Sequence, residues 1–182
     1  MEDRWQSDRD LIQYLSQQPW TVAFHLCPEL PWLDEHSART LGNQILSEVE
    51  RELFDEKPAS PMSMYLAGET QPDGTRWHYH GAARIVSQRR QKKLLRMGPS
   101  LIKKLVKEFV LSGGVRLPSG WQRLDQHALE RKVVEVIRPD VRIERWRPCG
   151  GLVRYSAKSW WQGNGEPVVC LVGSAGEVSG HS

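Results

Sequence analysis

Two histidines separated by one residue stand out in the segment "GTRWHYHGAARI" (residues 74–85) of this 182-residue chain. In a β-strand, residues i and i+2 point to the same face. His78 and His80 are therefore expected to share one face of a strand, with Trp77 and Tyr79 on the other. Two imidazoles placed in this way can hold a divalent metal ion, and they can also fall together by chance.

A carboxylate precedes the two histidines across the turn sequence "TQPDGT". If this turn is centred on Asp73-Gly74, Glu69 lies directly opposite His78, with Cβ atoms about 5 Å apart. A turn centred on Pro72-Asp73 leaves Glu69 diagonal to His78 on the same face. Only a turn centred on Asp73 alone moves Glu69 to the opposite face. Two of the three registers thus bring the carboxylate beside the imidazoles.

A site of two histidines and one carboxylate, Glu69, His78 and His80, suits a divalent ion such as Mn²⁺ or Mg²⁺, with Zn²⁺ a poorer match. A metal ion of this kind can polarise a phosphoryl oxygen. A metal ion bound by these residues would therefore indicate phosphate chemistry.

The segment "RYSAK" supplies a candidate nucleophile. Tyr155 and Lys158 are three residues apart, so they share a face if the segment is helical. A nearby cation favours the phenolate form of a tyrosine and offsets charge that grows on phosphate. The alternative is a buried tyrosine followed by a surface lysine.

The order of these motifs resembles that of the HUH endonucleases, and specifically the single-tyrosine replication-initiator (Rep) class of rolling-circle plasmids and single-stranded DNA viruses. "HYH" (78–80) matches the metal motif, with Glu69 as the third ligand on the preceding strand, and "YSAK" (155–158) matches the nucleophile motif. The short first motif corresponds to "TVAFHLCPELP" (21–31). The resemblance extends over about residues 19–173.

Two positions depart from the family pattern. Tyr79 stands between the histidines, where an aliphatic residue is commoner. The first motif carries His25 and Cys27 instead of its usual threonine-rich sequence. The role of residues 24–28 is therefore left open.

The resemblance implies an α+β fold, in which a five-stranded antiparallel sheet of the RRM-like HUH type carries flanking helices. It also implies a DNA endonuclease and strand transferase. Glu69, His78 and His80 would bind Mn²⁺ or Mg²⁺, and Tyr155 would form a covalent 5′-phosphotyrosine intermediate, with Lys158 offsetting charge. The expected partners are single-stranded DNA at a replication origin and host replication proteins. A single-tyrosine transposase and a non-catalytic nucleic-acid-binding module are the alternatives.

Basic residues are concentrated in one part of a chain whose net charge is only +3. Nine Lys or Arg and no acidic residue lie between positions 84 and 107. This pattern is typical of a surface that contacts a polyanion, or of a solvated helical face. The residues predicted to contact DNA are Arg84, Arg89, Arg90, Lys92, Lys93, Lys103, Lys104 and Lys107.

The periodicity of the chain predicts the elements that position these residues. Strands are expected at 19–26, 63–69, 76–86, 140–146 and 166–173, and helices at 34–56, 98–114 and 150–161, while 125–137 is ambiguous between the two. This order favours a single α+β domain over residues 1–173, followed by a polar tail at 174–182.

The composition is that of a globular protein, with 39% hydrophobic and 26% charged residues. No apolar run is long enough to span a membrane, and the N-terminus does not resemble a secretion signal. The three cysteines form no CxxC pair. We therefore expect an intracellular, cytoplasmic protein, in a bacterial host rather than a eukaryotic nucleus, with no membrane partner. The sequence does not predict the oligomeric state.

Overall fold

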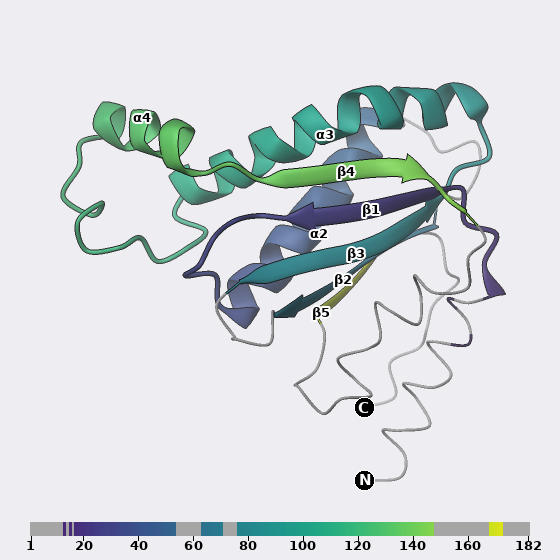
Figure 1. The fold of residues 1–182 in the computed structure, drawn as a ribbon, viewed down its shortest axis with the longest axis horizontal. Coiled ribbons are helices and arrows are strands. Elements are labelled where there is room, and N and C mark those ends of the chain that lie inside the picture. The colour runs from purple at the N-terminus through teal and green to yellow at the C-terminus, as the bar shows by residue number, and fades with distance from the viewer. Residues whose placement is uncertain are drawn as a thin grey trace, which may run out of the picture.

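A computed structural model describes residues 13, 15, 17–53, 63–70, 76–147 and 168–172. It confirms the α+β class: helices pack on an antiparallel sheet with strand order β4-β1-β3-β2-β5 (Figure 1). The elements are β1 Val22–Cys27, α2 Glu35–Leu53, β2 Ser63–Thr70, β3 Trp77–Arg84, α3 Gln88–Leu111, α4 Gln126–Val136, β4 Asp140–Arg145 and β5 Val168–Val172. No helix in these ranges combines the length and apolar character needed to cross a membrane.

The start of α3 differs most from the sequence prediction, which placed it ten residues later, at 98. The helix begins after Ser87, whose side chain accepts a hydrogen bond from the Arg90 backbone N–H at 3.4 Å. It continues through Gly98 and Pro99, which look like helix breakers in the sequence. A Cβ on Gly98 would lie 2.6 Å from Cδ1 of Ile143, so the glycine allows α3 to pack closely against β4.

The ambiguous segment 125–137 is helical. Asp125 is the N-cap of α4, and its side chain accepts a hydrogen bond from the Ala128 backbone N–H at 2.8 Å. The helix predicted at 34–56 corresponds to α2, Glu35–Leu53. Residues 54–56 of the prediction lie outside the described residues. The helix predicted at 150–161 and the tail at 174–182 lie outside the described residues.

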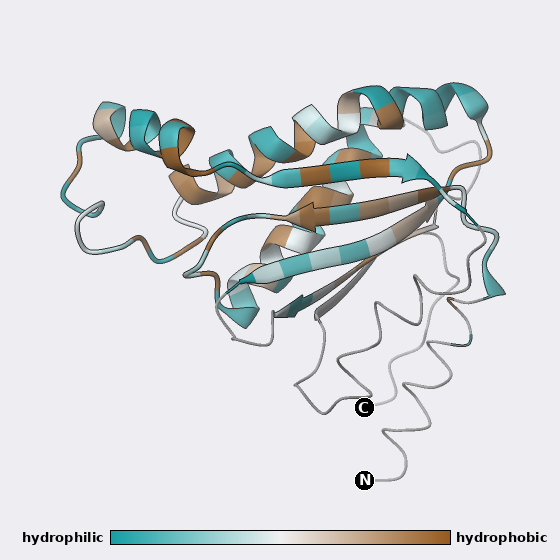
Figure 2. Cartoon of the chain, viewed as in Figure 1, coloured by the Kyte–Doolittle hydropathy of each residue, from teal (hydrophilic) through white to brown (hydrophobic). Residues whose placement is uncertain are grey.

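The two faces of the sheet have different roles. On one face, alternate residues such as Val22, Phe24 and Tyr79 form the main core with apolar residues of α2 and α3. Figure 1 shows both helices on this side of the sheet. Figure 2 shows the matching alternation of hydrophobic and hydrophilic residues along β4. Burial of the apolar face is the main source of stability for this layer pair.

Among the described residues, the second face carries a small apolar cluster together with polar groups. Leu15, Trp20, Tyr65, Ala67 and Ala82 form this cluster. The indole Nε1–H of Trp20 donates a hydrogen bond to the Leu15 carbonyl oxygen at 2.7 Å, which satisfies a buried donor. The histidines at 25, 78 and 80 lie on this same face because they alternate with the core residues of their strands.

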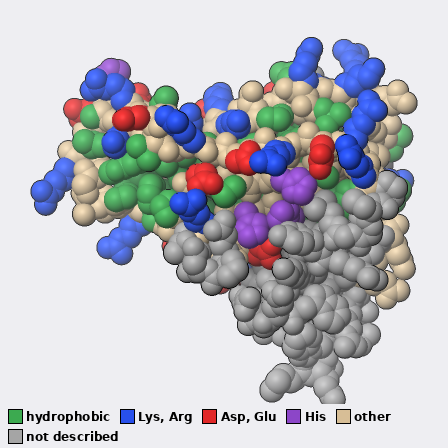
Figure 3. All heavy atoms as spheres, in the orientation of Figure 1, with side chains coloured by type: hydrophobic (Ala, Val, Ile, Leu, Met, Phe, Trp, Pro, Cys, Tyr) green, Lys and Arg blue, Asp and Glu red, His purple; other side chains and the backbone are tan. Residues whose placement is uncertain are grey.

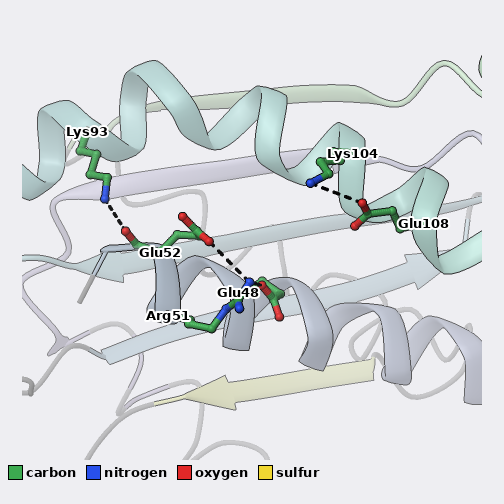
Figure 4. A network of polar contacts seen from close by, with 6 residues as sticks. All are labelled: Glu48, Arg51, Glu52, Lys93, Lys104 and Glu108. Carbon is green, nitrogen blue, oxygen red and sulfur yellow. Dashed lines mark hydrogen bonds and ion pairs between the residues drawn. The ribbon is translucent and has the colours of Figure 1, made fainter. Parts of the chain in front are cut away.

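A polar contact joins α3 to α2, and ion pairs within each helix flank it (Figure 4). The Lys93 ammonium donates a hydrogen bond to the backbone carbonyl of Glu52 in the last turn of α2. Within α2, Arg51 pairs with Glu48 and with Glu52. Within α3, Lys104 pairs with Glu108 one turn further along the helix. Lys93, one of the residues predicted to contact DNA, therefore also has an intramolecular role.

Gly81 allows β3 to approach β2 closely. It pairs with Leu66, and a Cβ on Gly81 would lie 2.1 Å from the Tyr65 carbonyl oxygen. Real Cβ atoms do not make such short contacts with backbone, so any larger residue would push the two strands apart. This close approach lies three residues from His78, and it supports the register on which the polar face depends.

Gly81→Ala is expected to lower the free energy of unfolding by about 2–3 kcal/mol, because the added methyl group overpacks a backbone contact. Urea unfolding followed by circular dichroism measures this. Gly120→Ala is the matched control, since a Cβ on Gly120 meets nothing within 4 Å. Equal stability changes in the two variants would show that the β2–β3 contact does not constrain the sheet.

Candidate metal centre

The pairing of β2 with β3 brings the predicted carboxylate opposite the histidine pair. Glu69 is the register partner of His78, and Ala67 is the partner of His80. This is the register expected for a turn centred on Asp73-Gly74. Residues 71–75 of the turn itself lie outside the described residues. The pairing of the flanking strands establishes that Glu69 lies opposite His78.

Three side chains converge on one point of the polar face. Oε1 of Glu69 is 2.8 Å from Nε2 of His78 and 4.0 Å from Nε2 of His80. One ligand atom from each of the three residues lies within 4.8 Å of the others. Their side chains are only 11%, 22% and 13% exposed, respectively. Figure 3 shows histidine side chains gathered on this face of the molecule, beside acidic ones.

These residues have the chemistry and the spacing of a metal site. Ligand atoms bound to a six-coordinate divalent ion at about 2.1 Å lie about 3 Å apart. The Glu69–His78 distance matches this spacing, and a small side-chain movement would bring His80 to it. Without metal, a proton on Nε2 of His78 holds the imidazole to the carboxylate. The cluster can therefore bind a metal ion in exchange for that proton.

The electrostatics of His80 favour the form that a metal ion needs. Burial lowers the pKa of His80 to about 4, and the neighbouring His78 and His25 add to this effect, whereas Glu69 opposes it. Burial acts in this direction because it penalises the charged imidazolium. At neutral pH, His80 therefore presents an unprotonated nitrogen, as metal ligation requires.

Tyr79, the unusual residue between the two histidines, anchors β3 to the helical layer. Its side chain is fully buried in the main core, and its hydroxyl donates a hydrogen bond to the Ala38 carbonyl oxygen of α2 at 2.7 Å. The hydroxyl explains how a tyrosine can occupy a position that faces the core. It also fixes which way His78 and His80 point, because neighbouring residues of a strand face opposite sides.

Two polar residues that the sequence did not assign extend the site. Nδ1 of His25 lies 3.1 Å from Nδ1 of His80, its register partner on β3. Nε2 of His25 lies 3.6 Å from Oε1 of Glu144 on β4. The sequence placed His25 in the strand predicted at 19–26 but left its role open. Glu144 had only a strand alternation as its signal, because the pairing of β1 with β4 joins residues more than a hundred positions apart.

The predicted nucleophile and its neighbour, Tyr155 and Lys158, lie outside the described residues. Of the predicted DNA contacts, Arg84 is exposed at the end of β3, on the same face as the histidines. The structure does not bring the other seven to this face, because α3 packs on the opposite side of the sheet. These are Arg89, Arg90, Lys92, Lys93, Lys103, Lys104 and Lys107.

Comparisons of this chain with models of known protein families, with curated proteins and with solved structures find no match. The site is therefore interpreted from its own residues and geometry.

The lowered pKa of His80 predicts that the metal-free protein loses stability on acidification. The unfolded chain takes up the His80 proton near pH 6.5, but the folded chain takes it up only near pH 4. Between these values the unfolded state binds more protons, so stability is full above about pH 6.5 and falls as the pH decreases. The expected loss from His80 is about 2 kcal/mol between pH 7.5 and pH 5.

Urea unfolding with a chelator present, at both pH values, measures this loss in the wild type and in His80→Gln. The variant should lack the His80 part of the pH dependence. His127→Gln is the control, because His127 is an exposed residue of α4. Identical pH dependence in wild type and His80→Gln would mean that burial does not disfavour the His80 proton.

Proposed function

We propose that this protein is a metal-dependent enzyme that nicks and joins single-stranded DNA by tyrosine transesterification, as HUH endonucleases of the replication-initiator class do. The observation that carries the proposal is the Glu69–His78–His80 cluster, with Oε1 of Glu69 2.8 Å from Nε2 of His78. Two imidazoles and one carboxylate with open positions suit Mn²⁺ or Mg²⁺, the ions used in phosphoryl chemistry.

The architecture supports the same proposal. An antiparallel sheet with helices on one face and a polar cluster on the other agrees with the RRM-like HUH fold. His25, His78, His80 and Glu69 come from three adjacent strands of this sheet. A rigid sheet is well suited to hold a reacting phosphate in one position, and such positioning is a large part of catalysis.

The reaction is an exchange of one phosphodiester for another. A metal ion at the cluster would supply positive charge to a non-bridging oxygen of the scissile phosphate. The Tyr155 phenol oxygen forms a bond to phosphorus and gives up its proton, while the bond from phosphorus to the 3′-oxygen breaks and that oxygen takes up a proton. The products are a free 3′-hydroxyl and a 5′-phosphotyrosine. Lys158 offsets negative charge near the tyrosine and the phosphate.

The proposed substrate is single-stranded or melted DNA at a replication origin. The free 3′-hydroxyl can prime a polymerase, so the reaction would start rolling-circle replication together with host replication proteins. Arg84 on the histidine face and the basic residues of α3 would attract the phosphate backbone and make binding sensitive to salt. Because the phosphodiester energy is kept in the covalent link, the strand can be rejoined without ATP.

Incubation with a diverse pool of single-stranded oligonucleotides and Mn²⁺ is expected to give a covalent protein–DNA adduct on a denaturing gel. Tyr155→Phe should abolish the adduct, because it removes the attacking oxygen, and a chelator should do the same. Tyr14→Phe is the matched control and should form the adduct as the wild type does.

His80→Ala should lose cleavage but keep salt-sensitive DNA binding.

An adduct that persists in Tyr155→Phe would contradict the assignment of the nucleophile. Salt-sensitive binding without an adduct from any oligonucleotide would favour a non-catalytic nucleic-acid-binding module. An adduct confined to DNA hairpins would favour a transposase of the same superfamily.

A further inference from the structure

A row of three polar side chains leads from the surface to the metal cluster across three neighbouring strands. Oε1 of Glu144 on β4 lies 3.6 Å from Nε2 of His25 on β1, and Nδ1 of His25 lies 3.1 Å from Nδ1 of His80 on β3. Nε2 of His80 in turn faces Oε1 of Glu69 at 4.0 Å. The hydrogen bond of the row is thus the one between His25 and His80, and the other ring nitrogen of each histidine faces a carboxylate at a longer distance.

Burial increases steadily along this row. The Glu144 side chain is 57% exposed, that of His25 is 33% exposed, and that of His80 is 13% exposed. His25 and His80 are direct register partners, so the backbone of the sheet fixes their separation. The rings meet edge to face, with centroids 5.1 Å apart. Arg142, the β4 partner of His25, pairs instead with Asp140 at 3.0 Å.

The contact between two Nδ1 atoms restricts where the protons lie. A hydrogen bond between neutral imidazoles needs one protonated and one unprotonated nitrogen. If His80 binds metal through Nε2, its single proton must be on Nδ1, and Nδ1 of His25 must accept it. His25 then carries its own proton on Nε2, which points to the Glu144 carboxylate. This arrangement provides the Nδ1–Nδ1 hydrogen bond at 3.1 Å and turns the remaining proton of His25 towards the Glu144 carboxylate at 3.6 Å.

We propose that His25 is a positioning residue of the metal centre: it accepts the Nδ1–H of His80, holds that imidazole in the tautomer whose Nε2 binds metal, and is itself oriented by Glu144. Partners of this kind fix the orientation of a metal-binding histidine and raise its basicity. The proposal assigns a role to the histidine that replaces the usual threonine-rich sequence of the first motif.

His78 differs from His80 in the hydrogen bonding of its Nδ1 atom. Its Nδ1 atom is buried and has no hydrogen bond to any residue in the described part of the chain. Its orientation therefore depends on the contact of Nε2 with Glu69. Of the two metal-binding histidines, only His80 contacts a second imidazole through its remote nitrogen among the described residues, so the effect of His25 should be specific to His80.

This inference rests on the metal site of the proposed function and not on the DNA chemistry. The test therefore uses Mn²⁺ binding, followed by electron paramagnetic resonance of the free ion, together with ¹⁵N NMR of the histidine rings in metal-free protein. His25→Phe keeps the ring but removes the acceptor, and we expect it to weaken Mn²⁺ binding about 10- to 100-fold. His25→Asn restores an acceptor atom at the δ position and should recover most of this loss.

The NMR measurement reports the tautomer directly. In the wild type we expect the His80 proton on Nδ1, and in His25→Phe a shift of the proton population towards Nε2. His127→Phe is the matched control; His127 is exposed on α4 and should affect neither measurement. A purely structural role of His25 would not be rescued by asparagine and would not alter the His80 tautomer.

The possible results separate this inference from the proposed function. If wild type and His25→Phe bind Mn²⁺ equally, or if the His80 proton is on Nε2 in the wild type, His25 does not position His80, while the metal site stands. If the wild type itself binds no Mn²⁺, the metal-dependent function fails and the positioning role fails with it. DNA cleavage without Mn²⁺ binding at this cluster would likewise contradict both the metal-dependent function and the positioning role of His25.

Discussion

The antiparallel register of β2 and β3 is the constraint on which the rest of the site depends. It sets Glu69 opposite His78 and so brings a carboxylate oxygen to 2.8 Å from an imidazole nitrogen. A slip of one residue would turn one strand over relative to the other and move Glu69 to the core side. Two features of β3 oppose such a slip: Gly81 permits the close strand approach, and the Tyr79 hydroxyl is bonded to α2.

The sheet separates stability from chemistry by using its two faces differently. The face covered by α2 and α3 buries large apolar side chains, which stabilises the fold. The other face can then hold imidazoles, and burial of the His80 ring disfavours its charged form, which lowers the pKa of His80. The lowered pKa of His80 favours metal binding, because an unprotonated imidazole is the form that binds metal. The same burial thus prepares the site for its proposed function.

Local sequence patterns predicted much of the fold and the centre of the site. Alternation and turn residues located the strands, and the hairpin limited Glu69 to three registers, one of which the structure has. The sequence could not predict that α3 begins at 88, because Gly98 and Pro99 look like breakers until the packing against Ile143 is known. Glu144 was missed because its role depends on the β1–β4 pairing, which no local pattern encodes. Tyr155 and Lys158 remain predictions from the sequence.

The most direct test of the central claim is the location of bound Mn²⁺ by paramagnetic broadening of backbone amide signals in NMR spectra. Substoichiometric Mn²⁺ should first broaden the signals of residues around Glu69, His78 and His80, including His25 on the neighbouring strand. Signals from α4, which contributes no residue to the site, should persist. Broadening centred elsewhere, or spread evenly over the protein, would contradict a metal centre on this face of the sheet.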